Sequence, residues 1–400
     1  MDFLGKIITK TPTQPTTSVA GGMWTMQEVA RFKAAGTWPS PPPVLELYAW
    51  GYNSSGQLGL GNTTSYSSPK QVGSLTNWSV VSSGYGPSVL AVTQSGALLS
   101  WGSNNNGQLG LGNTTNYSSP KQVGALTSWA TVSVGRGSGI AVKTDGTLWT
   151  WGNGFRGQLG LGNTTYYSSP KQVGALTNWR QVCGGGFRTF ATKTDGTLWS
   201  WGYGNSGVLG HGNTTNYSSP KQVGSLTNWS VVTSGRITTM CTKTDGTLWA
   251  WGSNSAGQLG LGNTTDYSSP KQVGALTTWK EAIEIDYASV ASKTDGTLWS
   301  WGRGSQGRLG LGNVTNYSSP KQIGALTTWS KLLSPFTPTG QFMGVIKTNG
   351  TLWVWGKNNN GQLGLGNTTN YSSPVQVGAL TTWVSVSGSY YNAMFGINTP

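Results

Sequence analysis

The chain has 400 residues, of which 61 are Gly, 21 are Trp and 15 are Tyr, while only 9% are charged. This composition favours turns and short β-strands with little helix, and no apolar stretch approaches the length of a membrane span. The net charge of +14 comes from a shortage of acids, 11 against 25 bases, and predicts a basic exterior that would steer anionic surfaces toward it.

Residues 1–43 differ in character from the rest of the chain. The stretch KTPTQPTT is rich in Thr and Pro, so we expect it to be extended and without a core. In TMQEVARFKAAG, Thr25 and Glu28 form a capping box and Gly36 suits a helix end, which predicts a short helix at about residues 25–35. The opening residues lack the apolar run of a signal peptide. We therefore predict an N-terminal arm at 1–43 and a second domain at 44–400, made in a cytoplasm.

A Trp-Gly pair returns about every 50 residues in the second domain. A fixed period of this length is typical of propellers and solenoids. The repeated tryptophans are Trp50, Trp101, Trp151, Trp201, Trp251, Trp301 and Trp355.

Each unit of this repeat predicts four strands. In residues 179–223, the strands WRQVC, RTFATK and TLWSWG are separated by a glycine loop and by the tight turn TDG, where Asp-Gly supplies the positive φ of a hairpin. A long glycine-rich loop then leads to PKQV, whose Pro suits an outer, edge strand. In the equivalent loop GQLGLGN we expect Leu109 and Leu111 to pack between units. Four strands per unit favour a β-propeller with radially packed blades.

The motif TDGTLWSWG, followed by GQLGLGN and PKQV, resembles the repeat of the regulator of chromosome condensation family. The resemblance covers about residues 44–399 and implies an all-β, seven-bladed propeller. The family also implies guanine-nucleotide exchange on a small GTPase or binding to chromatin. Its repeats commonly carry G-x-x-H in the first loop, and the corresponding positions here contain no His, which counts against those activities. These positions are Ser88, Ser138, Arg188, Thr238 and Ala288.

The two ends of the repeat region complement each other. LELYAWG, at 45–51, is a third strand without its first and second, and WVSVSGSYYNAMFGI, at 383–397, is a first and second strand without a third. We therefore predict that the N-terminal strand closes the ring, which leaves no propagating edge.

Comparison of the units shows two segments that vary: the loop between the first and second strands, and the residues after each Trp-Gly pair. Because strands alternate in direction, both segments lie on one face of the ring, which we call the variable face. Loops that differ on a rigid frame are where recognition occurs, and aromatic residues with Arg are frequent interface anchors. The predicted partner-binding residues are Tyr85, Arg136, Phe155, Arg156, Phe187, Arg188, Tyr203, Arg236, Tyr287, Arg303, Phe336, Tyr390 and Tyr391. Unselected drift on a solvent-exposed face is the alternative.

Few residues are suited to catalysis. The single histidine, His211, excludes a multi-His metal cluster and is interpreted as an isolated loop side chain. Glu281, Glu284 and Asp286 form the one acidic cluster, for which we predict a rim contact, with paired acid catalysis of Glu284 and Asp286 as the less favoured alternative. The glycine loop lacks the G-K-[ST] ending of a phosphate loop, and no nucleic-acid-reading motif occurs. We predict a non-enzymatic protein without cofactor or metal, without specific nucleic acid and without membrane insertion.

The segment GGMWTMQEVARFKAAGTWPSPP, residues 21–42, resembles a G-x-W…W-P module found at the ends of marine bacteriophage structural proteins. The resemblance implies an attachment arm anchored by Trp24, Met26, Phe32 and Trp38. The leading hypothesis is accordingly a tailed-phage virion protein, such as a tail fibre, appendage or decoration protein. Residues 1–43 would bind other virion proteins, and the variable face would bind a host-surface glycan or protein. The alternatives are guanine-nucleotide exchange, another intracellular protein-binding propeller or a protein inhibitor.

Overall fold

The computed structural model describes residues 27, 30, 31, 34, 42–332 and 340–400. The chain divides into two units, Met1–Val44 and Leu45–Pro400. In the first unit, Gln27, Ala30, Arg31 and Ala34 are helical and exposed. The predicted anchors Trp24, Met26, Phe32 and Trp38 lie outside the described residues. No helix among the described residues is long and apolar enough to cross a membrane.

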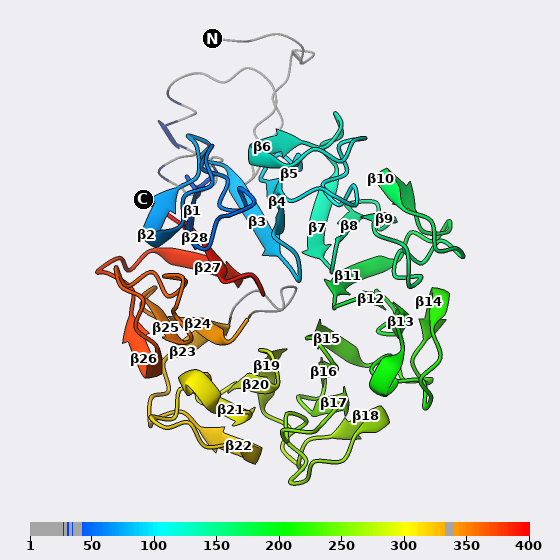
Figure 1. Ribbon diagram of the computed structural model, residues 1–400, viewed down its shortest axis with the longest axis vertical. Coiled ribbons are helices and arrows are strands. Elements are labelled where there is room, and N and C mark those ends of the chain that lie inside the picture. The colour runs from blue at the N-terminus through cyan, green and yellow to red at the C-terminus, as the bar shows by residue number, and fades with distance from the viewer. Residues whose placement is uncertain (1–26, 28–29, 32–33, 35–41, 333–339) are drawn as a thin grey trace. The chain divides into compact units, whose positions relative to one another are not determined.

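The second unit is a β-propeller, as the repeat predicted. Its described strands form seven four-stranded antiparallel sheets arranged in a ring (Figure 1). The innermost strands are β3 (Trp78–Ser83), β7 (Trp129–Val134), β11 (Trp179–Gly184), β15 (Trp229–Ser234), β19 (Trp279–Glu284), β23 (Trp329–Leu332) and β27 (Trp383–Gly388). The blades that begin with these strands are called blades 1 to 7 in that order.

The middle strands of each blade are almost wholly buried, because neighbouring blades cover both of their faces. The second strands are β4 (Ser88–Thr93), β8 (Ser138–Lys143), β12 (Arg188–Lys193), β16 (Thr238–Lys243), β20 (Ala288–Lys293), β24 (Phe342–Lys347) and β28 (Ala393–Asn398). The third strands, which carry the Trp-Gly pair, are β5 (Leu98–Gly102), β9 (Leu148–Gly152), β13 (Leu198–Gly202), β17 (Leu248–Gly252), β21 (Leu298–Gly302), β25 (Leu352–Gly356) and β1 (Glu46–Gly51).

The outer strands carry the repeated sequence YSSPKQ or YSSPVQ. They are β6 (Tyr117–Gln122), β10 (Tyr167–Gln172), β14 (Tyr217–Gln222), β18 (Tyr267–Gln272), β22 (Tyr317–Gln322), β26 (Tyr371–Gln376) and β2 (Tyr66–Gln71). Two 3-10 turns, η1 (Asn205–Gly207) and η2 (Ser305–Gly307), lie in the loops before β14 and β22.

Blade 7 contains both ends of the propeller sequence. Its strand order is β2-β1-β28-β27, so β1 lies between β28 and the outer strand β2. Trp50 of β1 is opposite Met394 of β28 in an unbroken antiparallel register. The prediction that the N-terminal strand closes the ring is confirmed.

The glycine-rich loop between the third and fourth strands of each blade contacts the next blade. Trp151 of blade 2 donates its indole N–H to the backbone carbonyl of Gln108 in the loop of blade 1, at 2.8 Å. Leu109 is fully buried beside this contact and Leu111 is half-buried against the same core, as predicted. The equivalent bonds join Trp50 to Gln362, Trp101 to Gln57, Trp201 to Gln158, Trp251 to Val208, Trp301 to Gln258 and Trp355 to Arg308.

The lysines that precede the hairpin turns do not belong to a solvated basic exterior. Lys143 is 9% exposed, and its Nζ lies 5.0 Å from the ring centroid of Trp129 and 4.0 Å from that of Trp149. This cation–π position recurs at Lys193, Lys243, Lys293 and Lys347. The exposed basic ring is formed instead by the outer-strand lysines, Lys70, Lys121, Lys171, Lys221, Lys271 and Lys321.

Candidate binding site at the centre of the variable face

The loops between first and second strands meet one another at the centre of the variable face. Backbone hydrogen bonds connect neighbouring loops: the N–H of Arg136 donates to the carbonyl of Gly186 at 2.8 Å, and that of Tyr390 donates to Gly84 at 3.3 Å. The backbones approach closely because this region is rich in Gly. A Cβ on Gly84, for example, would lie 2.1 Å from the carbonyl oxygen of Val134.

A cavity of about 280 Å³, open on one side, is lined by loops of five blades. Most of its wall comes from loops between first and second strands, and Tyr203 and Asn205 come from the loop between β13 and β14. The structure therefore brings both kinds of variable segment to one site. The lining residues are Tyr85, Arg136, Gly186, Phe187, Arg188, Tyr203, Asn205, Arg236, Ile237, Tyr390 and Tyr391.

Arginines of one blade stack on aromatic rings of the next blade. The guanidinium of Arg136 lies 4.7 Å from the ring centroid of Phe187, and that of Arg156 lies 4.7 Å from Tyr203. Arg236 is similarly placed over Tyr287, at 5.5 Å. Such contacts hold a long cationic side chain in one orientation, so the positive charge of this face is positioned rather than diffuse.

Tyrosines cover the side of the cavity next to blade 7. The rings of Tyr85 and Tyr390 are 5.1 Å apart, and Tyr391 follows at 6.3 Å from Tyr390. Tyr85 is only 6% exposed, whereas Tyr391 is 41% exposed. Tyr390 and Tyr391 also line a second hollow of about 480 Å³, together with Tyr52, Gln341, Lys357 and Asn360.

Blade 5 carries the acidic residues, and the structure buries two of them. Glu284 is 2% exposed, and its two carboxylate oxygens accept the backbone N–H groups of Arg236 and Tyr287, both at 2.9 Å. Burial raises the pKa of Glu284 to about 8, although the N–H of Tyr287 opposes the shift. Glu284 thus joins the inner loops of blades 4 and 5.

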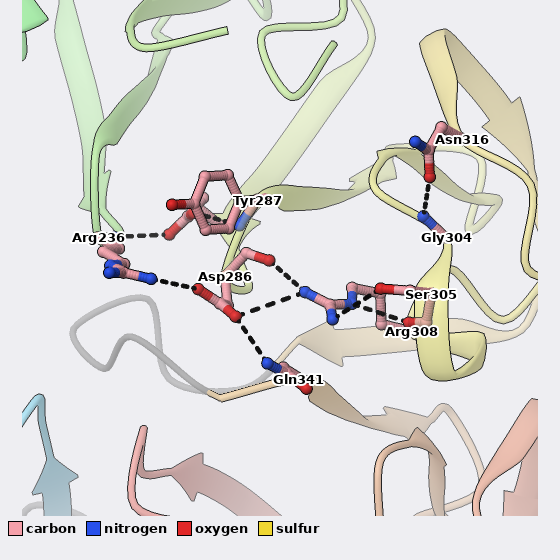
Figure 2. A network of polar contacts seen from close by, with 9 residues as sticks. Arg236, Asp286, Tyr287, Gly304, Ser305, Arg308, Asn316 and Gln341 are labelled. Atoms are coloured by element: carbon pink, nitrogen blue, oxygen red, sulfur yellow. Dashed lines mark hydrogen bonds and ion pairs between the residues drawn. The ribbon is translucent and has the colours of Figure 1, made fainter. Parts of the chain in front are cut away.

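Asp286 is the centre of a second polar network (Figure 2). It forms ion pairs with Arg308 at 3.5 Å and with Arg236 at 3.7 Å, and it accepts a hydrogen bond from Gln341 at 3.0 Å. Arg308, which is 2% exposed, also donates to the backbone carbonyl of Asp286. The network joins blades 4, 5 and 6.

The predicted acidic rim contact at Glu284 and Asp286 is therefore wrong. Both carboxylates are buried between blades. Glu284 ends β19 and accepts N–H groups from blades 4 and 5, whereas Asp286 lies in the turn after β19, where Asp286 and Tyr287 have positive φ angles of +43° and +69°. Three of the four oxygens accept structural hydrogen bonds, and the fourth, Oδ1 of Asp286, faces Arg236 at 3.7 Å, an arrangement that does not favour paired acid catalysis. Among the described residues, no group of three His, Cys, Asp or Glu side chains could hold a metal ion.

The remaining predicted residues lie around the cavity rather than in it. Phe155 is 56% exposed and contacts Arg156 at 4.8 Å, while Tyr287 and Arg303 contact each other at 4.8 Å. Phe336 lies outside the described residues. Sequence reasoning missed Asn205, Ile237 and Arg308. Arg308 occupies a position that is Gln or Val in the other units, so its change to Arg was an available signal.

The fold and the repeated inter-blade contacts define a repeat propeller, and comparison with known proteins gives its family. The model of the Regulator of chromosome condensation (RCC1) repeat matches residues 46–91, 95–142, 145–192, 195–242, 245–285, 295–331 and 349–395. The chain belongs to the RCC1-repeat family.

Matches to characterised relatives are short. The chain is 39% identical over 83 residues to the Ultraviolet-B receptor UVR8 of Arabidopsis thaliana, covering 20% of this chain and 19% of the receptor. It is 40% identical over 80 residues to Protein RCC2 of Homo sapiens, covering 20% of this chain and 15% of RCC2. The matches thus span less than a fifth of these relatives.

Solved structures share the whole propeller. Human WBSCR16 superposes with a TM-score of 0.78 at 20% identity, covering 89% of this chain and 99% of that one. Prp20p of Saccharomyces cerevisiae, whose structure was reported with its binding to Gsp1p and histones, superposes with a TM-score of 0.78 at 18% identity, covering 90% of this chain and 92% of Prp20p. At these identities the likeness shows the common fold.

Proposed function

We propose that this propeller is a non-enzymatic protein-binding module that docks a partner on its variable face. The observation that carries the proposal is the cavity shared by loops of five blades, which combines five aromatic rings with three arginines. Aromatic and Arg side chains in a partly enclosed site are the usual anchors of protein interfaces. The reported binding of Prp20p to Gsp1p and histones supports a protein as the partner class.

Guanine-nucleotide exchange is not favoured by an observation of this site, because the G-x-x-H positions carry no His. The virion role, with residues 1–43 as attachment arm and a host glycan as ligand, stays a prediction from the sequence of residues 21–42. The family similarities described above support the intracellular protein-binding alternative over that hypothesis.

The proposal is tested by selecting binders from a displayed library of random peptides against the full chain. We expect selected peptides to lose at least about tenfold in affinity, roughly 1.4 kcal/mol, when exposed residues of the variable face are replaced in Phe155→Ser or Tyr391→Ser. The matched control is Leu126→Ser, at a 52% exposed position of the uniform connections. Binders that respond to Leu126→Ser and to neither face variant would contradict the proposal.

A further inference from the structure

Arg188 is a buried cation that forms no ion pair with any of the residues that the structure describes. Its side chain is 4% exposed, and Nη1 donates to the backbone carbonyls of Arg236 at 3.0 Å and Gly235 at 3.3 Å. Nε has no hydrogen-bond partner among the described residues, and both hydrogen bonds of the Arg188 side chain use Nη1, so Nη2 makes none. A buried, unpaired guanidinium edge is costly, so its retention calls for a ligand.

The backbone of blade 3 is shaped around this side chain. A Cβ on Gly185 would lie 2.8 Å from Cγ of Arg188, and a Cβ on Gly186 would lie 3.8 Å from Nη2. Gly186 itself lines the cavity. The sequence GGGFR therefore leaves space for the guanidinium beside the main chain, with its Nη2 side next to the cavity wall.

The two buried acids of the inner loops, Glu284 and Asp286, form no ion pair with Arg188. Both oxygens of Glu284 accept backbone N–H groups, and Asp286 is held by Arg308, Arg236 and Gln341. The residues that line the cavity include Arg136 and Arg236, both exposed, and no carboxylate. The buried hydroxyl of Tyr85, a further lining residue, also has no hydrogen-bond partner.

These donors define the chemistry of the missing ligand. Nε and Nη2 lie on one edge of the guanidinium, and that edge matches the two oxygens of a carboxylate. The rings of Phe187, Tyr203 and Tyr390 supply an apolar wall, and a volume of about 280 Å³ accommodates a side chain with its neighbour rather than a folded element. We propose that the cavity binds an Asp or Glu side chain of the partner segment, flanked by an apolar residue, with Arg188 as its anchor and Arg136 and Arg236 at its entrance. This inference rests on the proposed function of the variable face.

The test uses the peptides selected against the full chain. We expect enrichment of Asp or Glu next to an apolar residue. By isothermal titration calorimetry, replacement of that acid by its amide should weaken binding at least about tenfold. Arg188→Gln should have a similar effect on the chain, whereas Arg180→Gln is the matched control, since Arg180 donates to the carbonyls of Trp229 and Ser230 away from this cavity. Phosphoserine in place of the acid should not restore binding.

Two further measurements keep the test informative if Arg188→Gln fails to fold. Arg136→Gln and Arg236→Gln change exposed side chains and should weaken binding about threefold, with a smaller salt dependence. In the unchanged protein, the Nε–H resonance of Arg188, assigned through its scalar couplings to the side-chain and backbone nuclei of the same residue, should shift on addition of the acidic peptide and not of its amide.

The outcomes separate the two proposals. Peptides that bind the variable face without acid enrichment, and whose affinity is unchanged in Arg188→Gln, would overturn the carboxylate site and leave the proposed function standing. Equal or tighter binding of the phosphoserine peptide would also overturn it, in favour of a phosphate site. Binders insensitive to Phe155→Ser and Tyr391→Ser would instead contradict the proposed function itself.

Discussion

The indole N–H of Trp50 donates a hydrogen bond to the backbone carbonyl of Gln362 at 3.0 Å. Trp50 lies on β1 of blade 7 and Gln362 lies in the glycine-rich loop of blade 6. The same contact joins each of the remaining pairs of neighbouring blades, so it also occurs where the ring closes. The closing blade is therefore fixed to its neighbour by the same interaction as a blade made from one continuous segment.

The glycine beside the equivalent contact between Trp151 and Gln108 leads to a first prediction. Gly110 has a φ of +74°, and a Cβ there would lie 2.9 Å from Nε1 of Trp151; Gly124 has a φ of +61° and open space around it. We expect Gly124→Ala to lower the free energy of unfolding by about 1 kcal/mol, because alanine is strained in a left-handed backbone conformation. Gly110→Ala should lower it by about 2 kcal/mol more, because its methyl group also displaces the indole. Urea unfolding measures both, and equal losses would show that the tryptophan contact tolerates the methyl group.

The buried ion pair of blade 5 leads to a second prediction. Asp286→Asn removes the charge that compensates the buried guanidinium of Arg308, so we expect a loss of about 3–5 kcal/mol in the free energy of unfolding. Arg236→Gln removes only the half-exposed partner, 48% exposed, and should cost less than about 1 kcal/mol. Denaturant unfolding of both variants checks the difference. A loss of less than about 1 kcal/mol in the free energy of unfolding of Asp286→Asn would mean that the carbonyl contacts of Arg308 are sufficient to stabilise its buried guanidinium.

The raised pKa of Glu284 predicts a pH-dependent stability. Because the pKa rises from 4.5 to about 8 on folding, the folded protein binds more protons than the unfolded chain between these values. The stability that the protonated Glu284 contributes is fully present below about pH 4.5 and is lost as the pH rises through about 8, by on the order of 5 kcal/mol.

The measurement is the free energy of unfolding as a function of pH. Glu284→Gln should flatten this part of the curve, even if its stability is lower throughout. Glu281→Gln, a partly exposed acid of the same strand, should leave the slope unchanged. A slope that persists in Glu284→Gln would assign the proton uptake to another group.

His211 predicts the opposite sign at lower pH. Its ring accepts or donates a hydrogen bond to Ser200 Oγ at 2.9 Å and contacts Tyr217 at 5.0 Å, and burial lowers its pKa from 6.5. The unfolded chain therefore binds the proton first, and stability is lost as the pH falls below about 6.5. We expect His211→Leu, which restores the residue of the other units, to remove this loss, measured by thermal unfolding at pH 7 and pH 5. An unchanged difference between the two pH values would contradict it.

The repeat made the ring and the packing of Leu109 and Leu111 predictable, but the polar contacts between blades were not predictable from it. The spacing of the Trp-Gly pairs and the incomplete first and last units were sufficient for the blade number and the closure by β1. The hydrogen-bond partner of Trp151 could not be predicted in this way, because it is a backbone carbonyl about one repeat away and depends on how neighbouring sheets pack. Alternation placed Glu284 and Asp286 on one face, but it did not indicate that neighbouring blades cover both of them, and the positive φ angles of Asp286 and Tyr287 after β19 have no signal in that pattern. For the same reason Arg188 and Tyr85 were predicted as surface anchors although both are buried.

The pairing of β1 with β28 imposes an order on assembly. These strands come from opposite ends of the propeller sequence, so blade 7 cannot form until the last unit has been synthesised, and closure brings together segments of very high sequence separation. Until then the nearly identical units can pair with the wrong neighbour, or with another chain, at an open edge. Folding yield during synthesis should therefore depend on how long the unfinished ring persists.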